Sequence, residues 1–113
     1  MDFNTARHFL ISQTVAPKEN LDTFFTRLTQ GEPPVPGQVT SLLLALKVVF
    51  EGLRQEPTLD RQLAYALLLL SQESRQLFEA GRKSGVSWPP LLDEDLIRIA
   101  RAAKSIFADE WQS

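Results

Sequence analysis

The chain has 113 residues, of which 43% are hydrophobic and 23% are charged, an ordinary composition for one globular domain. Its formal net charge of -2 provides no bulk attraction to nucleic acid or to an anionic membrane. It has no cysteine, which excludes disulfides, thiol nucleophiles and thiolate metal sites.

Two helices are predicted in the first third of the chain. The first can be capped by Asp2 or Asn4, and its apolar residues recur at helical spacing: Phe3, Ala6 and Leu10. The second lies in "PKENLDTFFTRLTQG", with Pro17 in its first turn and Gly31 as a left-handed cap at its end. One face of this second helix carries Leu21, Phe24, Phe25 and Leu28.

The next stretch, "GEPPVPGQ", holds three prolines between two glycines. Pro33 and Pro36 form a PxxP pattern, which in an exposed polyproline segment could dock into an aromatic groove of a partner. The same prolines also prevent one helix from continuing before the next begins. Because the stretch fits between two helical patterns, we interpret it as a corner.

The strongest apolar periodicities predict two central helices. The third helix runs from about residue 38 to 55, where Pro57 stops it, and the fourth runs from about 59 to 83, capped by Thr58 and closed by Gly85. We expect these two helices to form a central antiparallel pair. The buried side of the third helix is expected to hold Val39, Leu42, Leu43, Leu46, Val49, Phe50 and Leu53.

A rigid loop, "VSWPPLL", follows, and its Trp88 is expected to cover the helix ends. Asp93 is the predicted cap of a fifth helix, whose apolar stripe is Leu96, Ile99, Ala100, Ala103, Ile106 and Phe107. No segment shows a convincing strand pattern. The expected fold class is all-α, a single-domain bundle of about five helices.

Both central helices carry apolar residues on their polar faces. Leu44 falls within the polar stripe of the third helix, with Val48 at its edge. Leu68 does the same on the fourth helix, with Tyr65 and Leu69 beside it. If the helices are neighbours, these residues could form a contiguous patch of the kind that binds partners. The alternative is that the first two helices cover them.

The leading functional hypothesis is a non-catalytic binding or assembly module that meets a protein partner, or a second copy as a homodimer, through this apolar helical surface. The alternative is a regulator that contacts nucleic acid through Arg98, Arg101 and Lys104, which follow one flank of the last helix. The acidic total disfavours nucleic acid, as does the lack of aromatic residues among these cations in the sequence.

The start of the chain lacks the basic region and long apolar run of a signal peptide. The longest apolar run, residues 42–50, contains Lys47 and is far shorter than the roughly 20 residues that a membrane-spanning helix needs. We therefore expect residues 1–113 to form one soluble, cytoplasmic domain without a membrane partner.

Residue types that carry chemistry are sparse. His8 is the only histidine and has no acidic residue at a helical spacing. Successive carboxylates at residues 93–95 point in different directions on a helix, so helix capping explains them better than a metal site. We expect no catalytic residue, no metal, no cofactor and no small-molecule substrate, and hence no enzyme activity.

The stretches "GEPPVPGQVTSLLLALKVVFEGL" and "DRQLAYALLLLSQESRQLFEAGRKSGVSWPPLLDEDL" resemble a small family of all-helical cyanobacterial proteins of about this length. The resemblance extends from about Phe3 to Phe107 and implies a cyanobacterial, cytosolic protein, without assigning site residues. Some members carry a dethiobiotin synthetase label, and that ATP-using enzyme needs a glycine-rich phosphate loop. This sequence contains no G-x-x-x-x-G-K-[ST] motif, so we do not expect the label to apply.

Overall fold

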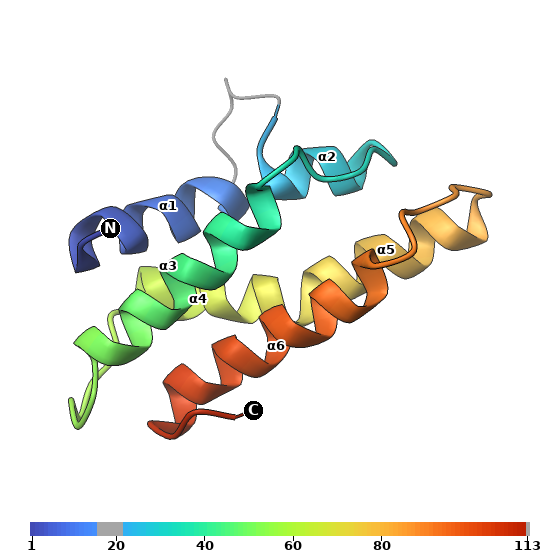
Figure 1. Cartoon of the computed structure of the whole chain (residues 1–113). Coiled ribbons are helices and arrows are strands. Elements are labelled where there is room, and N and C mark those ends of the chain that lie inside the picture. The colour runs from blue at the N-terminus through green and yellow to red at the C-terminus, as the bar shows by residue number, and fades with distance from the viewer. Residues whose placement is uncertain (16–21, 113) are drawn as a thin grey trace.

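The computed structural model describes residues 1–15 and 22–112, and each regular element in these ranges is a helix (Figure 1). The elements are α1 (Phe3–Thr14), α2 (Phe24–Thr29), α3 (Gln38–Gly52), α4 (Arg61–Leu68), the π-helical segment η1 (Leu69–Glu73), α5 (Ser74–Lys83) and α6 (Leu92–Ala108). The segments α4, η1 and α5 follow one another without a break and form one long helix. The predicted all-α bundle of five helices is confirmed.

Short polar side chains fix where several helices begin. The Asp2 carboxylate accepts the Thr5 N–H at 2.7 Å and caps α1, as predicted. The long helix begins later than expected, because Asp60 rather than Thr58 supplies its cap by accepting the Leu63 N–H at 3.1 Å. Both caps satisfy backbone donors that have no partner within the helix.

The second helix is shorter than its predicted segment. It has six residues and begins after Thr23, whose hydroxyl accepts the Thr26 N–H at 3.2 Å. The predicted first turn at Pro17 and the apolar position Leu21 lie outside the described residues. Gly31 has a φ of +74°, the left-handed conformation expected of a residue that ends a helix.

Two other predicted boundaries differ from the structure. Helix α3 ends at Gly52, before the predicted end at Gln55: Leu53 leaves the helical conformation with φ -105° and ψ 10°, and Gln55 is left-handed with a φ of +65°. Helix α6 begins at Leu92, so Asp93 lies inside its first turn instead of capping it. A carboxylate in that position interacts favourably with the helix dipole.

The corner segment "GEPPVPGQ" joins α2 to α3, as interpreted from its prolines. The Arg27 guanidinium donates to the Pro33 carbonyl at 2.6 Å, and the Val35 N–H donates to the Gln38 side chain at 3.1 Å. Gly37, with a φ of +83°, then directs the chain into α3. These contacts hold the corner against both helices that it connects.

The central helices lie diagonally across the core. Helix α3 packs mainly against α1 and α6, and the long helix packs against the same two, through α4 on α1 and through η1 on α6. In Figure 1, α3 and α6 run side by side in the same direction, while the long helix passes behind α3 in the opposite direction. The central helices therefore run antiparallel, but their closest packing partners are α1 and α6 rather than each other.

The hydrophobic core lies between α1, α3, the long helix and α6. Each of these four helices contributes fully buried side chains, which include Leu10, Leu42, Leu46, Leu63, Leu67, Leu70, Leu96 and Ile99. Burial of this apolar surface is the main favourable contribution to folding, at about 25 cal/mol per Å². Helix α2 packs on α5 and extends the bundle at one end.

Trp88 covers that end of the core, as predicted. Its ring stacks on Phe78 with centroids 5.8 Å apart, and its indole N–H donates to the Phe78 carbonyl at 2.9 Å. Gly81 permits this contact, because a Cβ at that position would lie 2.5 Å from the indole. The loop between α5 and α6 is thereby fixed to the long helix.

Candidate functional site

The predicted apolar strips are exposed but separate. Leu44 is 51% exposed, and Tyr65 and Leu68 are 50% and 45% exposed, so the first two helices do not cover these side chains. Val48 and Leu69 are half-buried beside them. The interpretation that placed these apolar residues among the polar ones is confirmed at Leu44, Tyr65 and Leu68.

A single patch made of both strips is ruled out by the arrangement of the helices. Leu44 lies about 160° around α3 from the buried Leu42, at about 100° per residue, and Leu68 lies equally far around its helix from Leu70. Since the two helices face each other diagonally across the core, their exposed sides point in opposite directions. The contiguous patch considered from the sequence required the two helices to be neighbours, and a helical wheel does not show which helices are neighbours.

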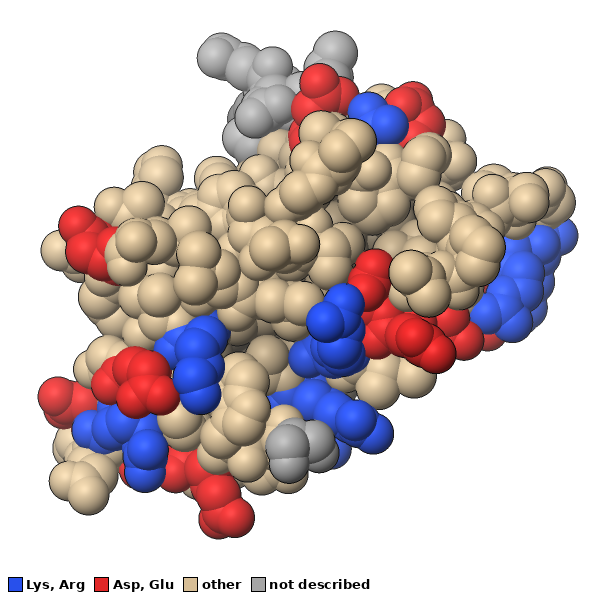
Figure 2. Space-filling view, in the orientation of Figure 1, with Lys and Arg blue, Asp and Glu red and all other residues tan. Residues whose placement is uncertain are grey.

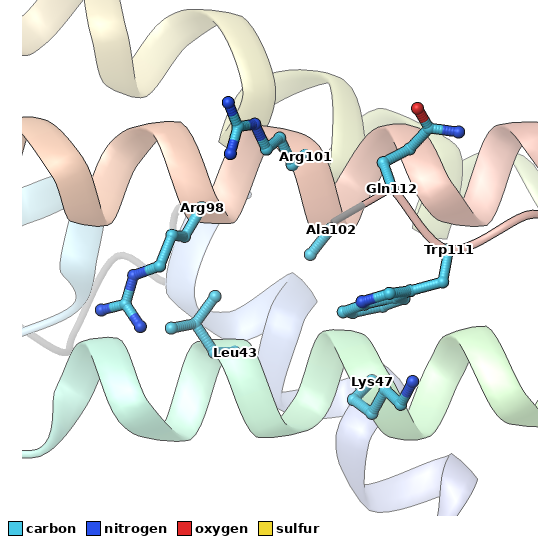
Figure 3. Close-up of a pocket in the computed structure, with 7 residues that line it drawn as sticks. All are labelled: Leu43, Lys47, Arg98, Arg101, Ala102, Trp111 and Gln112. Atoms are coloured by element: carbon cyan, nitrogen blue, oxygen red, sulfur yellow. The ribbon is translucent and has the colours of Figure 1, made fainter.

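A groove opens instead between α3 and α6 (Figure 3). It has a volume of about 370 Å³. We call it the cationic groove, and it is lined by Leu43, Lys47, Arg98, Arg101, Ala102, Trp111 and Gln112. Two of the three cations proposed from the sequence, Arg98 and Arg101, meet here, whereas Lys104 is exposed elsewhere on α6.

Helical spacing brings the walls of the groove together. Leu43 and Lys47 are four residues apart on α3, and Arg98 and Ala102 are four residues apart on α6, so each pair shares one helix face. Leu43 was expected in the core, but it is half-buried because its side chain forms part of the groove wall. In Figure 3, Arg98 extends from α6 toward α3 beside Leu43.

The C-terminal segment closes one end of the groove. The chain turns back at Asp109, which has a φ of +53° and accepts hydrogen bonds from the Arg54 side chain and the Gln55 N–H, both at 3.0 Å. The Gln112 N–H then donates to the Ser105 hydroxyl at 2.7 Å. These bonds tie the segment to the turn that follows α3 and to α6.

Trp111 is positioned by this segment and lies between the two helices (Figure 3). Its ring meets Phe50 edge to face, with centroids 5.1 Å apart, and the Lys47 amine lies 4.0 Å from its centroid. The ring is still 38% exposed. It therefore presents a fixed aromatic surface to anything that enters the groove.

The cations of the groove are held loosely. Arg98 pairs with Asp95 at 2.5 Å, and the Lys47 amine lies 3.4 Å from Glu51. The Lys47–Glu51 pair is exposed, and exposed ion pairs contribute only about 0–1 kcal/mol, whereas the Asp95 side chain that holds Arg98 is only 21% exposed. Within the part of the chain that the structure describes, the guanidinium of Arg101 forms no hydrogen bond or ion pair. In Figure 3, the Arg98 side chain extends toward α3, whereas the Arg101 guanidinium lies on the side of α6 away from α3, where it is open to a carboxylate from outside.

The surface around the groove carries mixed charge. Figure 2 shows Lys and Arg side chains gathered on the lower part of the face where α3 and α6 run side by side, with acidic side chains to both sides. Asp93, Glu94 and Asp95 stand in the first turn of α6, at the other end from Trp111. The cationic groove is therefore a local positive site on an acidic protein.

Sequence reasoning missed the aromatic part of this site. It found no aromatic residue interleaved with Arg98 and Arg101, yet the fold places Trp111 in the same groove. Trp111 follows the end of α6, so it belongs to no helical stripe. The only local signal would have been Asp109, a residue type that tolerates the left-handed conformation needed to turn the chain back.

Groups that could carry catalysis do not gather in this groove. His8 is exposed on α1. Within residues 1–15 and 22–112, no three His, Cys, Asp or Glu side chains stand close enough together to hold a metal ion. None of the described helices combines the length and apolar character that crossing a membrane requires. The pKa of Asp60 is lowered mainly by its hydrogen bond from Arg7, and this pair stabilises the start of α4 rather than a reaction centre.

Comparison of the chain with family models, with curated proteins and with solved structures gave no match.

Proposed function

We propose that this protein is a non-catalytic binding module that recognises an acidic segment of a partner protein through the cationic groove. One observation carries the proposal: Trp111 and three cations line the same open groove, together with an apolar floor. The cations are Lys47, Arg98 and Arg101, and the floor is Leu43 and Ala102.

This lining suits a protein segment that carries a carboxylate side chain next to an apolar side chain. Guanidinium and ammonium groups form short, charge-assisted hydrogen bonds with carboxylates, and arginine can form two of them at once. Trp and Arg are also the residues that contribute most often to the binding energy of protein interfaces. Trp111 and the two arginines line the same groove, so both contributions are available to one partner segment.

Nucleic acid is the second candidate, because cations beside an aromatic ring are also found in proteins that bind single strands. The neighbourhood argues against it. Asp95 already occupies Arg98, Glu51 lies beside Lys47, and further carboxylates stand in the first turn of α6. A continuous phosphate chain would meet these acids, whereas a protein segment can place single carboxylates between them.

The test uses a synthetic helical peptide with paired glutamates next to a leucine, titrated against the protein by calorimetry. Arg101→Glu should weaken binding about tenfold or more, because hydrogen bonds to charged groups contribute on the order of 1.5–3 kcal/mol. Lys104→Glu is the matched control, since it makes the same charge change on the same helix outside the groove. It should weaken binding clearly less than Arg101→Glu does, by about threefold or less, because Lys104 is only one helical turn from Arg101 but does not line the groove.

Three outcomes would overturn the proposal. One is no binding of the peptide to the unaltered protein. Another is an equal loss in Arg101→Glu and Lys104→Glu, which would mean diffuse attraction. The third is tighter binding of a single-stranded oligonucleotide, with an affinity that falls steeply as salt is raised, which would favour the nucleic-acid candidate.

A further inference from the structure

A second hollow lies where α3 and α6 begin. It has a volume of about 220 Å³, and it is lined by residues of the corner segment before α3 and of the proline-containing loop before α6. We call it the proline hollow, and its apolar lining is Pro34, Val35, Val39, Pro89, Leu91 and Leu92. Leu91 is 65% exposed and Val35 is 36% exposed, so apolar surface stands open to solvent at this point.

The proline hollow and the cationic groove lie one after the other along the seam between α3 and α6. On α3, Val39 belongs to the hollow, while Leu43 and Lys47 belong to the groove. These residues follow at intervals of four, so they share one face of the helix. At about 1.5 Å of rise per residue, Val39 and Lys47 are about 12 Å apart along the helix axis, or roughly two turns.

Charge divides this seam into two unlike ends. Asp95 lines the proline hollow and pairs with Arg98 at 2.5 Å, while Asp93 pairs with Arg75 at 2.6 Å and so lies toward the long helix. The other end holds Lys47 and Arg101 with Trp111. A carboxylate finds cations in the groove and none in the lining of the hollow, whereas an uncharged apolar side chain fits the apolar lining of the hollow.

We propose that the partner segment is an amphipathic helix that lies along this seam, with an apolar anchor in the proline hollow and acidic residues in the cationic groove. The inference rests on the proposed function, and it adds the class of the partner segment and the orientation in which that segment lies along the seam. Its anchor and its carboxylates should be about two helical turns apart, to match the spacing of Val39 and Lys47 on α3. A helix laid in a groove is an established mode of peptide recognition.

This occupant follows from charge and apolar surface together. A polyanion such as nucleic acid offers no aliphatic side chain for the proline hollow and would meet Asp95 at that end. A purely apolar helix would leave the cations of the groove without an acidic partner. An acidic amphipathic helix satisfies both ends at once.

The experiment uses three synthetic peptides. The first carries a leucine anchor and two glutamates about two turns later, the second has serine in place of that leucine, and the third has a proline between the two ends. Protein variants are Leu91→Ser at the hollow and Arg101→Glu at the groove. Leu68→Ser is the matched control, because Leu68 is also an exposed leucine but lies on the long helix.

Leu91→Ser should weaken the first peptide about tenfold, the order expected when the apolar contact of one leucine is lost. The peptide without the anchor should be insensitive to Leu91→Ser, and the peptide with the proline should bind at least about tenfold more weakly than the first. Leu68→Ser should bind all three peptides like the unaltered protein. Circular dichroism should show a gain in helix when the first peptide binds.

The outcomes separate the two proposals. If Arg101→Glu weakens the first peptide and Leu91→Ser does not, the acidic-segment function stands and the seam is overturned. Equal binding of the proline-containing peptide would overturn the helical occupant. An equal loss in Leu68→Ser would show non-specific apolar binding and would overturn the hollow as a site. If no peptide binds the unaltered protein, both proposals fail.

Discussion

The amine of Lys47 lies 4.0 Å from the centre of the Trp111 ring, and this contact joins the C-terminal segment to α3. The same ring meets Phe50 edge to face. Two elements that are far apart in the sequence are thus held together by one side chain that is still partly open to solvent.

Removing this ring should loosen the C-terminal segment. Trp111→Ala is expected to lower the free energy of unfolding by about 1–2 kcal/mol, less than the roughly 3–5 kcal/mol for a fully buried tryptophan, because Trp111 is partly exposed. Trp111→Phe keeps an aromatic face over Phe50 and should lose less than half as much. Urea melts of the two variants measure the difference, and equal losses would mean that the aromatic contact contributes nothing.

Stability should fall at acidic pH through Asp60. Its pKa lies below the ordinary value of 3.8, first because Arg7 donates to its carboxylate and then because of its bonds to the start of α4. A carboxyl group with a lowered pKa in the folded protein stabilises it at pH values above the ordinary pKa. That stabilisation is lost as the pH falls through the folded value.

Asp60→Asn provides the comparison, because asparagine still caps a helix but carries no charge. Between about pH 5 and pH 2, the unaltered protein should lose about 0.5 kcal/mol more than this variant, a small difference because the ion pair is exposed. Denaturant melts at a series of pH values measure it. Parallel curves for the two proteins would contradict the assignment of Asp60.

The exposed leucines outside the seam should tolerate charge. Leu44→Glu and Leu68→Glu are each expected to change the free energy of unfolding by less than about 0.5 kcal/mol, because both side chains are exposed. Leu67→Ala, at the fully buried position beside Leu68, should cost about 2–5 kcal/mol.

Thermal melts and light scattering on these variants check both expectations. The solution mass should be the same in Leu44→Glu and Leu68→Glu as in the unaltered protein, because the proposed binding surface is the seam. A lower mass in one variant would instead identify that exposed strip as a contact between copies of the chain.

A methyl group at Gly81 should displace Trp88. The added Cβ would lie 2.5 Å from the indole, so the ring would move and its hydrogen bond to the Phe78 carbonyl would be strained or lost. Gly81→Ala is expected to cost about 1–3 kcal/mol, as overpacking does. In a Trp88→Leu background the same change should be nearly neutral. A similar cost in both backgrounds would show that the effect does not act through Trp88.

Much of the helical structure could be predicted because local pattern encodes it. Asp2 marks the start of α1, and Gly31 and Gly85 adopt the left-handed conformation at helix ends. The helical period also placed Leu44 and Leu68 among polar residues, and the structure decides that the first two helices leave them exposed. In each case the physical cause acts within a few residues of the chain.

The candidate site could not be predicted in the same way. A helical period shows which face is buried, but it does not show that α3 faces α6 rather than the long helix. The position of Trp111 depends on the bonds that Asp109 accepts from Arg54 and Gln55, which no local pattern encodes. The groove is therefore a product of tertiary packing.

The ion pair between Arg54 and Asp109 connects residues 55 positions apart. Contacts over such a distance form late in folding, since a long loop must close before they become favourable. As the chain is synthesised, α3 is complete before the C-terminal segment that supplies Trp111 exists. A truncated or half-folded chain would have helices but no completed groove, so affinity for an acidic peptide would report that the whole domain has folded.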